Sequence, residues 1–98
     1  MEFIESSLDG WPAIEFEVDS PLGGTRILHA LESLYEISLV PNLYDMDGEA
    51  VTIDFEFSGS AAQLCVQDWG VSYLAFVDVD VRNHVLATLL DLPPNYFS

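Results

Sequence analysis

Residues 45–57 read DMDGEAVTIDFEF. The pair Asp47-Gly48 favours a two-residue β-hairpin, because a type I′ turn needs positive φ at both central positions. Apolar and polar residues then alternate through VTIDFEF, which is typical of a strand with one buried face. The stretch predicts a hairpin between strands over about 38–45 and 49–57. Pro41 has no amide hydrogen, which makes the first of these an edge or bulged strand.

The rest of the chain predicts three further strands. Residues 12–19, PAIEFEVD, alternate in the same way, and residues 61–69 and 71–81 follow the short turns SGS and Gly70. Because consecutive strands are joined by hairpin-length connections, the sheet is predicted to be mainly antiparallel.

Two segments predict helices. Leucine and isoleucine recur at helical spacing over about 24–36, and the same holds for RNHVLATLLDL over 82–92, which Pro93-Pro94 ends. Two amphipathic helices are enough to cover one face of the sheet. The predicted fold is α+β, a single domain over 1–98 with about five strands and two helices packed on one face.

The charge balance is the most informative feature of the composition. The 98 residues include seventeen Asp or Glu against two arginines and no lysine, a formal net charge of −15. That balance argues against direct binding to nucleic acid or anionic lipid and favours steered association with a basic partner. No apolar run approaches the ~18 residues that span a bilayer, and the first residues are acidic where a secretory signal is basic. We therefore expect a cytoplasmic protein.

The acidic residues alternate with apolar ones in IEFEVD at 14–19, VTIDFEF at 51–57 and VDVDV at 77–81. Alternation places these carboxylates together on the sheet face away from the helices. Leu74 and Phe76 are predicted on the same face, with Tyr73 and Ala75 turned to the helices. Carboxylates about 5 Å apart on neighbouring strands repel one another. The predicted acidic set is Glu15, Glu17, Asp19, Asp54, Glu56, Asp78 and Asp80.

The sequence gives little support for a metal site or for catalysis. DMDGE at 45–49 resembles a calcium loop, but with Gly48 at the sixth position Leu43 falls where an aspartate is required. Cys65 cannot form an internal disulfide, and His29 and His84 lie outside zinc-ligand spacing of it. The sequence has no nucleophile elbow, phosphate loop or Cys-His signature. We expect neither an enzyme nor a cofactor.

The size, the charge and the three acidic stretches resemble, as a class, small bacterial immunity proteins that neutralise a nuclease toxin, and also nucleic-acid mimics. The resemblance implies a protein inhibitor whose partner is a basic protein, a nuclease toxin in the preferred hypothesis. The acidic set above would form its salt bridges. Phe76 or Trp69 would be the apolar anchor.

Three alternatives stay open. A nucleic-acid mimic would inhibit defence nucleases or DNA-binding regulators, and a structural or assembly module would leave the acidic strands solvated. Adaptation to high salt would explain the acidity without a partner. The interface itself could be the sheet face, the helix face with Glu32 and Glu36, or the 45–49 hairpin. The sequence does not determine the oligomeric state.

Overall fold

The chain folds into one sheet and two helices. The computed structural model describes residues 2–17, 21–36, 43–47, 50–66, 71–93 and 96. Its elements, in chain order, are β1 (Ile4–Leu8), β2 (Trp11–Glu17), α1 (Pro21–Tyr35), β3 (Leu43–Asp47), β4 (Ala50–Phe57), β5 (Ser60–Val66), β6 (Val71–Phe76) and α2 (Val79–Leu90).

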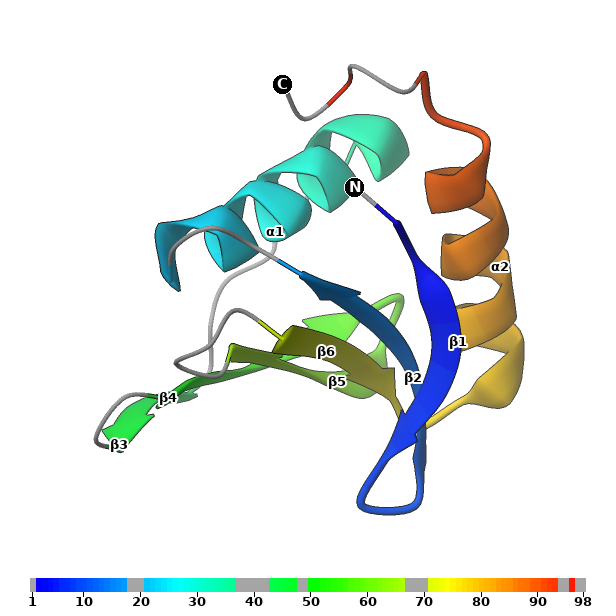
Figure 1. Ribbon diagram of the computed structural model, residues 1–98. Helices are drawn as coiled ribbons and strands as arrows, with labels where there is room; N and C mark the ends of the chain where they lie inside the picture. The colour runs from blue at the N-terminus through cyan, green and yellow to red at the C-terminus, as the bar shows by residue number, and fades with distance from the viewer. Residues whose placement is uncertain are drawn as a thin grey trace.

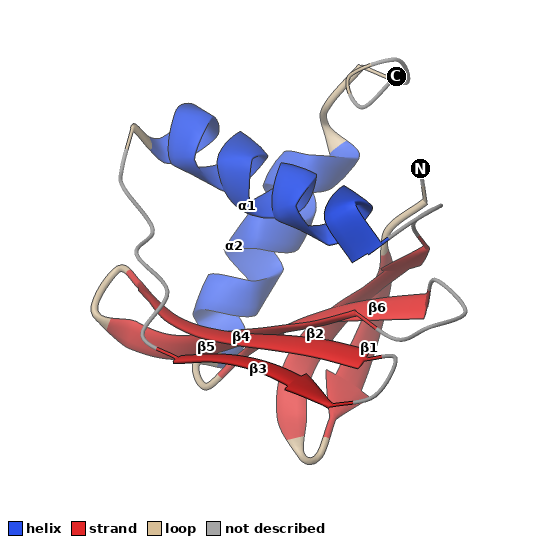
Figure 2. Cartoon of the chain, turned by 90° about the vertical axis from the view of Figure 1, so that its left-hand side faces the viewer, coloured by secondary structure: helices blue, strands red, loops and turns tan. Residues whose placement is uncertain are grey.

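The strands form a six-stranded sheet in the order β1-β2-β6-β5-β4-β3, and every neighbouring pair is antiparallel. Both helices lie on the same side of this sheet (Figure 2). The α+β class and the two-layer arrangement are confirmed. The sheet has one strand more than predicted, because β1 was missed.

The path of the chain explains the strand order. After the β1–β2 hairpin, α1 crosses the sheet and leads to β3 at the far edge (Figure 1). Strands β3 to β6 then return as a meander until β6 pairs with β2. The two central strands, β5 and β6, are therefore flanked by β4 on one side and β2 on the other.

Two tight turns shape the hairpins. At Asp9-Gly10 the φ angles are 51° and 86°, and at Ser58-Gly59 they are 52° and 79°. Positive φ at both central residues is the type I′ geometry, whose twist matches that of the strands it joins. The Asp-Gly signal that predicted a hairpin at Asp47-Gly48 also occurs at Asp9-Gly10, where it defines β1.

The predicted hairpin after residue 45 is confirmed, but its position along the chain differs. Asp47 is the last residue of β3 and pairs with Ala50, so it belongs to the strand and not to the turn. Residues 48 and 49 lie outside the described residues. Strand β3 is an edge of the sheet, as predicted. Pro41, on which that prediction rested, is also outside the described residues.

The core fills the space between the sheet and the helices. Its largest fully buried side chains include Phe16, Phe55 and Phe76 from the strands. Phe57 packs edge-on against Tyr35 of α1 at 5.1 Å between ring centroids and against Phe76 at 5.8 Å. The Tyr35 hydroxyl lies 2.9 Å from the Thr88 hydroxyl of α2, so one hydrogen bond joins the two helices at this point.

The predicted strand over 71–81 is wrong at its C-terminal end. Strand β6 ends at Phe76, and α2 begins at Val79. Asp78 is the N-cap of α2: its carboxylate accepts a hydrogen bond from the Asp80 amide at 2.8 Å. A capping aspartate satisfies an amide that the first helical turn leaves without a partner. The VDVD stretch therefore starts a helix and does not extend a strand.

Candidate partner-binding surface

The sheet face away from the helices has no element of the described chain packed on it (Figure 2). We call it the open face. Along β2, β4, β5 and β6, residues on this face alternate with residues that face the helices. Its members on β1, β2, β4, β5 and β6 include Ile4, Ser6, Leu8, Trp11, Ala13, Glu15, Glu17, Thr52, Asp54, Glu56, Ala61, Gln63, Cys65, Val71, Tyr73 and Ala75. By register, Leu43, Asp45 and Asp47 of β3 and Ala50 of β4 share this face.

One row of the open face runs across four neighbouring strands. Glu15 of β2 pairs with Tyr73 of β6, Tyr73 pairs with Cys65 of β5, and Cys65 pairs with Thr52 of β4. The Tyr73 hydroxyl donates a hydrogen bond to the Glu15 carboxylate. The Thr52 hydroxyl points to the Cys65 sulfur at 4.0 Å, the long limit of such a contact. This row joins a carboxylate at one end to uncharged polar groups in the centre.

Tyr73 lies half-buried in the middle of the sheet. Its partial burial raises the pKa of the phenol above the usual 10.0, and the neighbouring Glu15 charge and hydrogen bond act in the same direction. The hydroxyl therefore stays protonated and donates to Glu15 throughout the neutral range.

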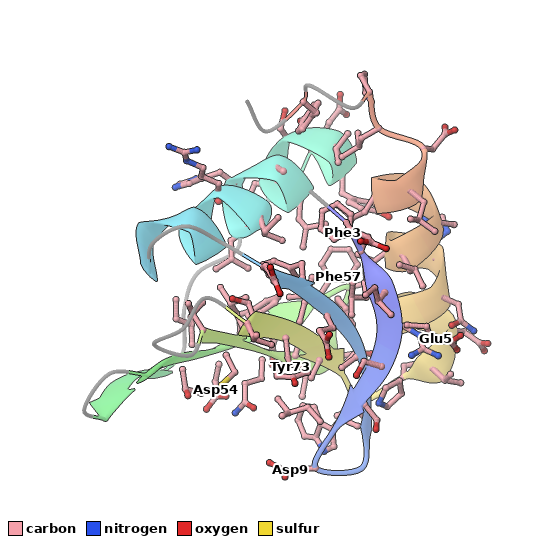
Figure 3. All side chains as sticks on the ribbon, viewed as in Figure 1. Phe3, Glu5, Asp9, Asp54, Phe57 and Tyr73 are labelled. Atoms are coloured by element: carbon pink, nitrogen blue, oxygen red, sulfur yellow. The ribbon has the colours of Figure 1, made fainter. Side chains whose placement is uncertain are left out.

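The next row has a second paired carboxylate. Asp54 of β4 accepts a hydrogen bond of 2.9 Å from the Gln63 side-chain amide of β5. Gln63 in turn pairs with Ala75 of β6. Figure 3 shows Asp54 and Tyr73 on the side of the sheet opposite the helices, whereas Phe57 points towards the core.

No carboxylate directly faces another carboxylate in the described strand pairs. Glu15 faces Tyr73, Glu17 faces Val71, Asp54 faces Gln63, and Glu56 faces Ala61. For β2 and β4 the reason is the strand order: SAAQLCV of β5 and VSYLAF of β6 contain no charged residue and lie between these two acidic strands. The acidic β3 is a direct neighbour of β4, but its Asp45 and Asp47 pair with Thr52 and Ala50. Chain order alone does not reveal this placement.

The structure distributes the predicted site residues over different regions. Glu15, Glu17, Asp54 and Glu56 lie on the open face, as predicted. Asp78 and Asp80 are exposed at the start of α2, so their predicted place on the sheet face is wrong. Asp19 and Trp69 lie outside the described residues.

The prediction that Phe76 lies on the open face is also wrong. Its side chain is 0% exposed and packs against Phe57 in the core, and Leu74, in the same strand phase, is also buried in the core. Tyr73 and Ala75 take the opposite phase, on the open face. Phe76 therefore offers no apolar anchor to a partner. Residues in a position to do so include Tyr73, which the predicted phase had turned towards the helices, and Ile4, which is 47% exposed.

All basic side chains of the chain lie on the helices. Arg26 and His29 belong to α1, and Arg82 and His84 belong to α2. His29 lies 3.4 Å from Glu32, where its imidazole pairs with a carboxylate on the helix surface. The open face has no basic side chain, so nothing on it offsets its carboxylates.

Arg82 is removed from the surface. It is 5% exposed, and its guanidinium donates to the Ser6 and Ala13 carbonyls at 3.0 and 3.2 Å and to the Glu5 carboxylate at 2.8 Å. These hydrogen bonds and the ion pair connect α2 to the β1–β2 hairpin. Arg26 remains as the exposed arginine, which leaves the surface more acidic than the composition suggests.

Neither described helix is long and apolar enough to cross a bilayer. The described residues also hold no group of three or more His, Cys, Asp or Glu side chains arranged to bind a metal ion. Comparison of the chain with protein-family models, curated proteins and solved structures gave no significant match.

Proposed function

We propose that this chain is a protein inhibitor that binds a basic partner through the open face, in the manner of an immunity protein that neutralises a nuclease toxin. The supporting observation is a sheet face that no described element covers, that bears carboxylates and that has no basic side chain. On a chain with a formal net charge of −15, that face is suited to a cationic surface.

The physical basis of the proposal is electrostatic complementarity. A field of one sign steers a partner of the opposite sign and raises the association rate by 10- to about 1000-fold. The aromatic Tyr73 between the carboxylates adds a side chain of the type that often dominates binding energy. The proposed protein binds its partner and has no catalytic activity. We propose that it acts in the cytoplasm, where Cys65 would be reduced.

A nucleic-acid mimic is the second candidate, and one observation favours it. The acidic strands β2 and β4 are three strand spacings apart, about 14 Å at the usual spacing. Two negatively charged strands at this separation are comparable to the ~12 Å width of the DNA major groove. Such a mimic would bind in the nucleic-acid-binding sites of several unrelated proteins.

The two candidates differ in the number of partners, and one experiment tests both. The chain is immobilised and exposed to native lysate from its source at low and moderate salt, and the captured proteins are purified and assayed for nuclease activity. We expect one basic nuclease, inhibited at equimolar chain and released by salt. Inhibition of several unrelated nucleic-acid binders would indicate the mimic.

Variants of the chain link the inhibition to the open face. Glu15→Lys combined with Asp54→Lys reverses two charges there, and Glu36→Lys combined with Asp91→Lys reverses two exposed charges at the ends of the helices. We expect the first variant to lose at least about tenfold in inhibition and the second to retain it. Equal losses, or a folded first variant with full inhibition, would contradict the proposal.

A further inference from the structure

Strand β1 forms one edge of the sheet. It has β2 as its neighbour on one side and no strand of the described chain on the other, which we call the free side of β1. The strand is open to solvent: Ile4 is 47% exposed and the Glu5 side chain 68%. An edge strand presents a row of backbone amides and carbonyls that can pair with a further strand.

The hairpin determines which backbone groups of β1 point to the free side. A two-residue turn joins Leu8 to Trp11, so these two residues exchange hydrogen bonds, and such pairs alternate with pairs that do not. Ser7 therefore faces Pro12 in a pair without hydrogen bonds, in agreement with the missing amide hydrogen of Pro12. By the same alternation, the amides and carbonyls of Glu5 and Ser7 point away from β2.

Strand β1 lacks the features that usually prevent edge strands from pairing. Its sequence IESSL contains neither lysine nor proline, and it pairs with β2 residue for residue, without a bulge. Its one charged side chain, Glu5, is bound by Arg82 of the same chain at 2.8 Å. Helix α2 packs mainly on β2 and β6, which are set back from this edge.

Strand β1 is also complementary to an antiparallel copy of itself. When all five residues pair, Ile4 faces Leu8 of the copy, Glu5 faces Ser7 of the copy, and Ser6 faces its own counterpart. No charge then faces a like charge. The outward backbone groups of Glu5 meet those of Ser7, so each of these pairs can exchange both hydrogen bonds.

Other registers are disfavoured. Sliding the copy by two residues sets Glu5 against Glu5 in one direction and against Asp9 in the other, and like charges that face each other are destabilising. Sliding it by one residue sets outward backbone groups against inward ones, so the hydrogen bonds are lost. The sequence of β1 therefore selects one register.

The opposite edge of the sheet does not have this property. Strand β3 also has five residues, LYDMD, and two of them are aspartates. An antiparallel copy of β3 with all five residues paired would set Asp45 against its own counterpart, and facing carboxylates repel. Self-pairing is therefore expected at the β1 edge and not at the β3 edge.

We propose that two copies of this chain associate through β1, antiparallel about a two-fold axis at Ser6, and join their sheets into one. Ile4 of each copy lies beside Leu8 of the other, and Trp11 faces Leu8 across the hairpin, so apolar side chains meet on the open-face side. The interface is one strand wide, so the dimer is weak, with a dissociation constant on the order of 0.1 mM. This inference does not depend on the proposed function.

Sedimentation equilibrium of the purified chain measures the association. Each copy carries a formal net charge of −15, so the two copies repel each other and salt screens that repulsion. We expect the dissociation constant to fall at least about fivefold between roughly 0.05 and 0.5 M salt. Binding of a basic partner weakens with salt instead, so the two kinds of association are distinguishable.

Proline on the free side tests which edge is used. Ser7→Pro removes an outward amide but no hydrogen bond to β2, so the hairpin is expected to stay intact, and folding is checked by circular dichroism. Ser7→Ala, the matched control, keeps the amide. We expect Ser7→Pro to weaken the dimer at least about tenfold and Ser7→Ala to leave it unchanged.

Cysteine variants measure the register and do not depend on the proline variant. Both are made with Cys65→Ala, which removes the native thiol. At the two-fold axis the Cα atoms of the Ser6→Cys pair are about 4.5 Å apart, which allows a disulfide. Those of the Ser7→Cys pair are about 8 Å apart, beyond the limit of ~7 Å. Ser6→Cys should form a covalent dimer at least about tenfold faster, although Ser7 is the more exposed of the two.

Three results would overturn the proposal. The first is a chain that stays monomeric in both salt solutions at a concentration on the order of 1 mM, ten times the expected dissociation constant. The second is self-association that a folded Ser7→Pro variant does not weaken. The third is covalent dimerisation of Ser7→Cys as fast as that of Ser6→Cys. None of them affects the proposed function, which depends on the open-face reversals in the inhibition assay.

Discussion

The two faces of this sheet consist of alternate residues of the same strands, yet different demands act on them. On β4, Ile53, Phe55 and Phe57 are buried against the helices, whereas Asp54 and Glu56 between them face outward. The residues of the helix-covered face are apolar because burying their side chains away from water stabilises the fold. The open face is not needed for the core, so its residues are free to serve binding.

The largest expected difference between the faces comes from truncating an aromatic side chain on each. Phe76→Ala leaves a cavity in the core and should lower the free energy of unfolding by about 3–5 kcal/mol. Tyr73→Ala, three residues earlier on the open face, should lower it by about 1 kcal/mol. Urea unfolding followed by circular dichroism measures both. Similar losses in the two variants would mean that the faces are not energetically distinct.

Arg82 links the two layers through its buried guanidinium. Arg82→Ala removes the hydrogen bonds to the Ser6 and Ala13 carbonyls and the ion pair with Glu5, and it should cost about 2–3 kcal/mol of unfolding free energy. The exposed Arg26→Ala, which removes the same charge, should cost less than about 0.5 kcal/mol. If both arginines cost equally little, these contacts do not stabilise the fold.

Asp78 tests whether an acidic residue outside the open face has a structural role. Asp78→Ala removes the N-cap of α2 and should cost about 1 kcal/mol, while Asp78→Asn, which still accepts the bond from the Asp80 amide, should cost far less. Thermal unfolding of the two variants measures the difference. A loss of the same size in both would assign the effect to charge and not to capping.

The smallest effect concerns Tyr73 at alkaline pH. Because its pKa is raised in the folded protein, the folded state holds the phenolic proton more tightly than the unfolded chain does. This contribution to stability is complete below the ordinary pKa of 10.0 and is lost as the pH rises through the folded value. Urea unfolding between about pH 9 and about pH 11 should therefore show a smaller fall for Tyr73→Phe than for the original chain. A fall of the same size in both would contradict this role.

Much of the helix-covered face follows from sequence. The alternation in PAIEFEVD and VTIDFEF predicts Ile14, Phe16, Ile53 and Phe55 as core residues, and all four are buried. Helical spacing predicts both helices, with α1 beginning three residues earlier than the expected 24 and α2 beginning three residues before the expected 82. These patterns are strong because one face or stripe is apolar and the other is polar.

Strand β6 is a case in which alternation of apolar and polar residues does not determine which face is buried. In VSYLAF both phases contain large apolar or aromatic groups, so period-two alternation does not distinguish the face of Tyr73 from that of Phe76. The following VDVD resembled a continuing strand and selected the wrong phase. The hydroxyl of Tyr73, which is better placed near solvent, and the capping preference of Asp78 favour the correct one.

The strand order is a second feature that alternation does not provide. Crossing by α1 to the far edge places the uncharged β5 and β6 between the acidic β2 and β4. This arrangement depends on contacts distant in sequence. It separates the carboxylates of β2 from those of β4 by an uncharged centre.

The most direct test of the open face as the binding surface is an NMR titration of the ¹⁵N-labelled chain with an arginine-rich helical peptide. We predict that amide shift changes concentrate in Ser60–Val66 and Val71–Phe76 and in the acidic ends of β2 and β4, with little change in Pro21–Tyr35 and Val79–Leu90. Changes concentrated in the two helices, with the central strands unaffected, would show that the partner surface lies on the helix layer and would contradict the account.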